Sequence, residues 1–256
     1  NKTKLDTLLI FRGLLALSVV VWHFTGFNQN IPAAVNIPGR TAVWIFFGIS
    51  GYVISYGFLK ERYLLNAAGL KAFYINRFLR IYPLFLLLSF LAVVSEYFSK
   101  GNFPIGFSDI PAQVLMLQFN HEYVLNGVFW TLGIEVQFYI IAPLIVMLFI
   151  DKYNKKFLFN IAVYFLLLAQ IYMTYYFLGW SFDGRSLLSN LPHFFIGMIG
   201  CKFVLANKER KFNRYFLGAI ILLLICFTNY LYQHSVKYYW TLGMVLIDLV
   251  IFFAIL

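Results

Sequence analysis

Charged side chains are scarce in this chain. Asp, Glu, Lys and Arg together make up 12% of its 256 residues, whereas hydrophobic residues make up 62%. A soluble domain has about a quarter charged residues and about half apolar ones, so this composition excludes an ordinary soluble domain. The long apolar runs do not alternate with polar residues, which favours helices over membrane strands. We therefore predict an all-α integral membrane protein, a polytopic transmembrane helix bundle.

Cysteine and acidic residues are also few. Both cysteines, Cys201 and Cys226, lie in apolar runs, so we expect neither a disulfide framework nor a metal site. Ten acidic residues against 20 basic ones give a net charge of +10, which by itself would suggest a nucleic-acid partner. Linkers rich in Gly and Ser are absent, and no internal repeat stands out. These absences predict a single transmembrane domain over residues 1–256.

Eight apolar segments are long enough to cross a bilayer. Between the third and the fourth, the segment 107–119 is too short to cross and is interpreted as a re-entrant or interfacial piece. The predicted spans are 8–27, 41–59, 80–98, 127–149, 157–178, 186–206, 214–232 and 238–256.

The basic residues give these spans a predicted orientation. With the N-terminus in the cytoplasm, every Lys and Arg falls on the cytoplasmic side except Arg40, Lys100, Arg185 and Lys237. Such an excess on one side is the usual signature of membrane topology. The basic charge is therefore explained by the lipid bilayer, and we expect no nucleic-acid partner.

The first span carries two residues that are costly inside hydrocarbon, Arg12 and His23. Eleven helical steps of about 100° come to about three full turns, so both side chains share one face. At about 1.5 Å per residue they lie about 16 Å apart along the axis. Because imidazole can exchange a proton near neutral pH, His23 is the candidate catalytic base. The alternative is a histidine that only bonds a neighbouring helix.

Two further arginines, Arg77 and Arg80, lie at the same predicted membrane boundary as Arg12. They are three residues apart and would share a helix face. Guanidinium groups bind phosphates through paired donors, so we predict that the three arginines bind a phosphate-bearing ligand. The alternative for Arg77 and Arg80 is contact with lipid headgroups.

Glu135 lies well inside the fourth predicted span. A carboxylate there must be paired, solvated or protonated. We expect it in the same half of the bilayer as His23, where it could orient the imidazole; alternatively it only holds two helices together. Asp248 and His193 rank lower, and His193 is interpreted as a packing residue.

Five motifs in chain order resemble the acyltransferase-3 family of membrane acyltransferases. Each motif is weak by itself, but the five matches run in the expected order from about residue 8 to 200. They are the pair Arg12 and His23, FFGISGYVIS at 46–55, INRFLRIYPLF at 75–85, FWTLGIEVQFY at 129–139 and LPHFFIGMIG at 191–200.

The resemblance implies about ten spans, so we expect this chain to lack its C-terminal spans. It further implies a multi-pass protein of the bacterial inner membrane that moves an acyl group, usually acetyl from acetyl-CoA, to a glycan on the extracytoplasmic side. The resemblance also implies that His23 is the catalytic residue and that Arg12, Arg77 and Arg80 bind the acyl donor. The family's Asp-x-x-Arg-Gly run is not matched, because Asp6 lies six residues before Arg12.

The hypothesis is direct transfer, with His23 as general base and Glu135 orienting it. A covalent acyl-histidine is less favoured. Two other classes stay open: a proton-coupled transporter or flippase of a lipid-linked glycan, and a non-catalytic partner in glycan assembly. The sugar, the hydroxyl or amine that is modified, the acyl length and the oligomeric state are not specified.

Overall fold

Apolar runs fold into α-helices throughout the part of the chain that the structure describes. This computed structural model describes residues 2–25, 37–101, 110–116, 129–150, 157–178, 184–207 and 212–256, and it holds no strand in these ranges. The α-helices, in order, are α1 Lys2–Thr25, α2 Gly39–Leu59, α3 Ala67–Lys100, α4 Ile110–Val114, α5 Trp130–Ile145, α6 Phe157–Leu178, α7 Leu187–Ala206, α8 Arg214–His234, α9 Val236–Tyr238 and α10 Met244–Ile255. Two π-helical turns, η2 Val146–Ile150 and η3 Tyr239–Gly243, continue α5 and lead into α10.

The helices confirm a multi-pass membrane fold. Within the described residues, 6 are long and apolar enough to cross a membrane: α2, α3, α5 with η2, α6, α7 and α8. Shorter apolar helical stretches occupy Leu8–Phe24 and Tyr239–Ile255. All of these coincide with predicted spans. The predicted orientation is not tested by the helices themselves and stays a prediction.

The largest difference between a predicted and an observed boundary is at the start of the third helix. The third helix begins at Ala67, well before the predicted start at residue 80, because the Asn66 side chain accepts a hydrogen bond from Gly69 N and caps the helix there. Of the predicted interfacial segment 107–119, the described part is the short helix α4 and the turn after it. The remainder of that segment lies outside the described residues.

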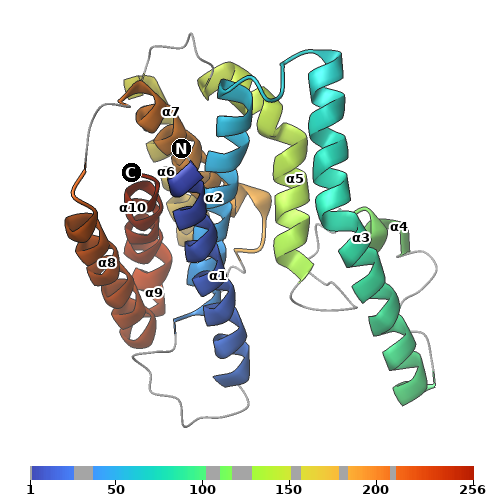
Figure 1. The fold of residues 1–256 in the computed structure, drawn as a ribbon. Helices are drawn as coiled ribbons and strands as arrows, with labels where there is room; N and C mark the ends of the chain where they lie inside the picture. Colours follow the sequence, from blue (N-terminus) through green and yellow to red (C-terminus); the bar gives the residue numbers. More distant parts are fainter. Residues whose placement is uncertain are drawn as a thin grey trace. The chain divides into compact units, whose positions relative to one another are not determined.

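Contacts divide the chain into two units. The first unit comprises Asn1–Tyr56, Phe149–Phe182 and Leu191–Leu256, and the second comprises Gly57–Leu148 and Asp183–Asn190. The helices of the first unit run alongside one another (Figure 1). The two units are considered separately below.

Glycines allow α2 and α7 to approach closely inside the first unit. A Cβ at Gly51 would lie 2.1 Å from the backbone oxygen of Phe194, and one at Gly197 would lie 1.9 Å from that of Gly48. These distances leave no room for any other residue, as at the small-residue contacts of membrane helices. In an apolar stretch of 18 residues, 72% of α2 and 61% of α7 is accordingly buried inside the protein.

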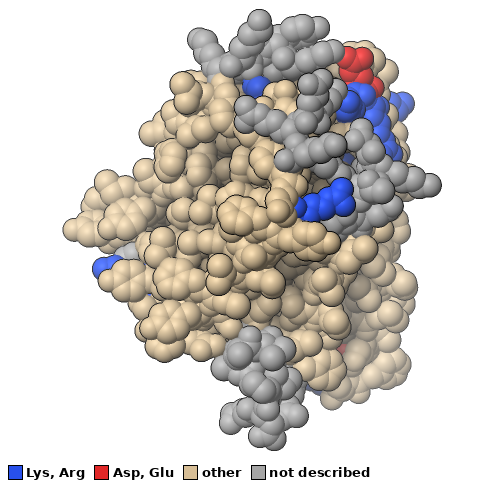
Figure 2. All heavy atoms as spheres, turned by 60° about the vertical axis from the view of Figure 1, so that its left-hand side comes forward, with Lys and Arg blue, Asp and Glu red and all other residues tan. Residues whose placement is uncertain are grey.

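The outer helices of the first unit present apolar side chains to their surroundings. In an apolar stretch of 18 residues, only 17% of α6 and 17% of α8 is buried. Leu158, Phe177 and Leu223 are among the exposed residues of these helices. Figure 2 shows one face of the molecule, on which residues other than Lys, Arg, Asp and Glu cover most of the described surface. Such a surface suits lipid and not water.

The second unit is built on α3 and α5. Tyr74 of α3 donates a hydrogen bond to the backbone oxygen of Ile140 at 3.0 Å. Phe73 is fully buried and touches the rings of Phe58, Tyr63 and Tyr139. This aromatic contact fixes the face that α3 turns toward α5, which is the face that carries Arg77.

We expect Gly197→Leu to destabilise the first unit, because its side chain would collide with the backbone of Gly48. Overpacking of this kind costs about 1–3 kcal/mol. Thermal unfolding of the purified protein in detergent measures the effect. Gly13→Ala is the control, since a Cβ at Gly13 meets nothing within 4 Å; helix propensity there favours Ala by up to about 1 kcal/mol. Equal melting temperatures for the two variants would contradict the proposed close approach.

Candidate functional site

Arg12 and His23 lie on one continuous helix. Because α1 runs without interruption from Lys2 to Thr25, the predicted separation of about 16 Å along one face applies to them. Arg12 is half-buried, and its guanidinium carbon lies 6.0 Å from the centre of the Phe46 ring. His23 is exposed, two residues before the end of α1.

The residue beside His23 holds this end of α1 in place. Trp22 meets the ring of Tyr232, from α8, edge to face with centroids 5.5 Å apart. Trp22 also lies against Gly39 at the start of α2, where a Cβ would be 2.8 Å from its ring. Contacts to two helices fix the backbone of Trp22, and therefore the position from which the His23 imidazole extends.

The second unit links Arg77 to Glu135 through Tyr139. The guanidinium carbon of Arg77 lies 5.2 Å from the centre of the Tyr139 ring and 5.4 Å from that of Phe73. Tyr139, one turn after Glu135 on α5, donates a short hydrogen bond to the Glu135 carboxylate. The tyrosine therefore presents a ring face to the cation and a hydroxyl to the anion.

Arg80 lies one turn beyond Arg77 on α3. Its side chain is exposed, whereas Arg77 is half-buried, and the charges of both arginines act on the Tyr139 hydroxyl. The buried Arg77 Nε has no hydrogen-bond partner among the described residues. Two cations and one carboxylate thus gather in the second unit around one tyrosine, in an arrangement able to bind an anion.

All five predicted site residues lie on described helices, but two predicted associations among them are not tested. His23 belongs to the first unit and Glu135 to the second. Contact between the imidazole and this carboxylate stays a prediction. The same holds for a shared phosphate site of Arg12 with Arg77 and Arg80.

A second ionisable cluster in the first unit was ranked low by sequence reasoning. His193 Nδ1 lies 2.6 Å from Asp248 Oδ1, and Tyr164 donates a hydrogen bond of 2.6 Å to Asp248 Oδ2. The cluster joins α7, α10 and α6. The signal that could have found it is the one that identified His23, an ionisable side chain inside an apolar run. Sequence alone could not show that the two side chains meet, because they lie 55 positions apart.

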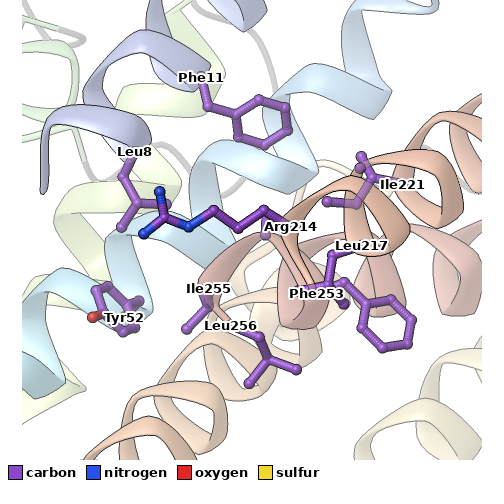
Figure 3. Close-up of a pocket in the computed structure, with 11 residues that line it drawn as sticks. Leu8, Phe11, Tyr52, Arg214, Leu217, Ile221, Phe253, Ile255 and Leu256 are labelled. Atoms are coloured by element: carbon purple, nitrogen blue, oxygen red, sulfur yellow. The ribbon is translucent and has the colours of Figure 1, made fainter. Parts of the chain in front are cut away.

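A pocket opens at one end of the first unit, near the start of α1 (Figure 3). Its volume is about 320 Å³. Apolar side chains of α1, α8 and α10 form most of the wall, and the Arg214 side chain extends across it toward Leu8. Leu8 lies one helical turn before Arg12. The pocket therefore combines apolar walls with the cation of Arg214, within one helical turn of the cation of Arg12.

Among the described residues, no three His, Cys, Asp or Glu side chains gather as a metal site would require.

Comparison with known proteins places this geometry in context. The sequence model of one family, the acyltransferase domain (Acyltransferase 3), matches residues 6–256. A protein of Haemophilus influenzae that carries no functional name is 32% identical over 152 residues, 51% of this chain and 60% of that protein. The peptidoglycan O-acetyltransferase OatA of Listeria monocytogenes is 27% identical over 179 residues, 64% of this chain and 28% of that protein. The chain thus spans less than two thirds of the length of each of these relatives. No solved structure matches it significantly.

The hydrogen bond between Tyr139 and Glu135 gives a testable prediction. Tyr139→Phe leaves a partly buried carboxylate without this donor, which costs about 1–3 kcal/mol. Glu135→Gln removes the charge that the bond satisfies, so the double variant should lose less than the sum of the single variants. We expect a coupling of about 0.5–3 kcal/mol from thermal unfolding of the four proteins. The same cycle with Tyr74→Phe in place of Tyr139→Phe is the control, and equal coupling in both cycles would contradict the assignment.

Proposed function

Because the chain belongs to the acyltransferase-3 family of membrane acyltransferases, we propose that it moves an acetyl group from acetyl-CoA to a hydroxyl of a cell-surface or lipid-linked glycan. The observation that carries the proposal is the family match over residues 6–256, which includes every predicted site residue. A relative that acts on a glycan, the peptidoglycan O-acetyltransferase OatA, supports the class of acceptor.

Three arginines would bind the donor. Coenzyme A carries phosphates at one end and a thioester at the end of a long, largely uncharged arm. Arg77, held over two rings, and the exposed Arg80 offer paired donors to phosphate. Arg12 lies one turn from the pocket of Figure 3, whose Arg214 adds a further cation at the same end of α1. Under the predicted orientation, all three arginines lie toward the cytoplasm, where acetyl-CoA is made.

His23 would act as the general base. The acceptor hydroxyl oxygen attacks the thioester carbonyl carbon, so that a C–O bond forms and the C–S bond breaks. The hydroxyl proton passes to the imidazole and then to the departing thiolate, and the ring ends as it began. This direct route needs no covalent intermediate on the protein. Glu135 is the carboxylate proposed to orient the ring.

We expect His23→Ala to lower acetyl transfer by about 10²–10⁴-fold, the usual contribution of a general base. Purified protein in a membrane glycan extract, supplied with acetyl-CoA labelled in its acetyl group, provides the measurement. His234→Gln is the matched control, because His234 is exposed on α8 and its contacts among the described residues are with Tyr230 of its own helix. A folded His23→Ala protein with normal transfer would overturn the role of His23. Glycan movement by the wild type without use of acetyl-CoA would instead indicate a transporter.

For the donor site, we expect the double variant Arg77→Ala with Arg80→Ala to raise the apparent KM for acetyl-CoA. Loss of charge-assisted hydrogen bonds of about 1.5–3 kcal/mol corresponds to roughly 10-fold or more. Arg62→Ala is the control, since Arg62 is an exposed arginine of the same unit on the same predicted side. An unchanged KM for the double variant would count against the assignment.

A further inference from the structure

The first unit buries an acid-paired histidine that the proposed mechanism does not use. His193 and Asp248 have 0% and 1% of their surface exposed. Each oxygen of the Asp248 carboxylate has its own partner, at 2.6 Å in both cases: His193 Nδ1 on one and the Tyr164 hydroxyl on the other. Both oxygens of this buried carboxylate are therefore engaged by neighbouring side chains.

The carboxylate also fixes the state of the imidazole. Because Asp248 is an acceptor, His193 Nδ1 carries the shared proton, and a neutral ring then has its lone pair on Nε2. Trp44 of α2 stacks on the ring with centroids 5.0 Å apart and sets the plane in which Nε2 points. That nitrogen is buried and has no hydrogen-bond partner among the described residues.

A histidine that served only to tie helices together would not need this unpartnered nitrogen. Leaving a buried polar atom unsatisfied costs about 1–3 kcal/mol, and such atoms in a folded protein call for a reason. An imidazole that is oriented by a carboxylate at one nitrogen and open at the other is the arrangement of a proton acceptor.

The net charge of the His193–Asp248 pair also favours a proton acceptor at His193. With a neutral ring, the pair carries one net negative charge inside an apolar unit. Uptake of one proton at Nε2 makes the pair neutral overall, an imidazolium beside a carboxylate, and removes the buried net charge. Around the pair, α6 contributes the Tyr164 hydroxyl, and α2 contributes the uncharged Trp44 ring. Behind that ring lie Tyr239 and Trp240 of η3, the latter beneath the Arg40 guanidinium.

We propose that His193, positioned by Asp248 and Tyr164, is a buried proton-accepting site whose open Nε2 binds a hydroxyl or water and takes up a proton during the transfer reaction. Its role in transfer rests on the proposed function. There the acceptor hydroxyl loses one proton when the ester forms, and the coenzyme A thiolate gains one when it leaves. His193 receives that proton from the His23 imidazole and passes it back, so His23 stays the base that contacts the acceptor hydroxyl and the reaction as a whole neither gains nor loses protons.

The first arm of the test needs no catalysis. Protein labelled with ¹⁵N-histidine in detergent gives ring signals for its 4 histidines, and the His193 signal is the one missing from His193→Gln. If that variant does not fold, Gln variants of the other three histidines assign the signal by elimination. We expect the His193 ring signals to show reversible protonation at Nε2, and Asp248→Asn to alter them. A His193 ring that keeps one protonation state throughout, while the protein stays folded, overturns the proposal.

The second arm uses labelled acetyl-CoA and the pH profile of kcat. We expect about a 10²-fold loss of kcat in Asp248→Asn with a displaced pH profile, a smaller loss in Tyr164→Phe and a wild-type profile in His234→Gln. A structural role alone would lower the melting temperature and leave the pH profile in place, which would overturn the part in transfer. Absence of transfer by the wild type would refute the proposed function, whereas the NMR titration would still decide whether His193 binds a proton.

Discussion

The cost of placing a polar group among apolar helices governs where this chain can keep its ionisable side chains. An unpaired charge in such a setting is too unfavourable to persist. Asp248 therefore has a tyrosine hydroxyl and an imidazole on its two oxygens, and Glu135 takes the hydroxyl of Tyr139. In both units a tyrosine from a neighbouring turn or helix supplies the donor, because its ring can be buried while its hydroxyl bonds a carboxylate.

The close approach of α2 and α7 places the imidazole as well as the helices. The backbone oxygen of Phe194 fills the space above Gly51, so α7 cannot slide or rotate on α2 without a clash. His193 immediately precedes Phe194 and is carried by the same turn onto the ring of Trp44. Phe194 in turn stacks on Phe47, at 4.6 Å between centroids. The glycines that allow tight packing are thus also what fixes the plane of the buried histidine.

The features that the sequence predicts correctly are those that depend on residues within one segment. Apolar length predicted the membrane helices, and the helical period put Arg12 and His23 on one face of α1, because both depend only on neighbouring residues. It ranked His193 and Asp248 low because their partnership is a long-range contact between α7 and α10 with no local signature. The start of α3 was also placed too late, since the Asn66 cap acts on a segment of mixed polarity that a search for membrane spans passes over.

The first unit by itself contains groups suited to both ends of an acyl transfer. Arg12 and the pocket beside Leu8 lie toward one end of α1, and His23 lies two residues from the other end. His193 is six positions into α7, about 9 Å along the axis from its first residue, and Trp44 is a similar distance into α2. A rigid helix of fixed rise separates the Arg12 cation from the His23 imidazole, so under the proposed function a donor held by its phosphates at Arg12 would have to extend its thioester along α1 to reach His23. The reach of the donor, more than the reactivity of any single side chain, would then decide which acyl-CoA the unit can use.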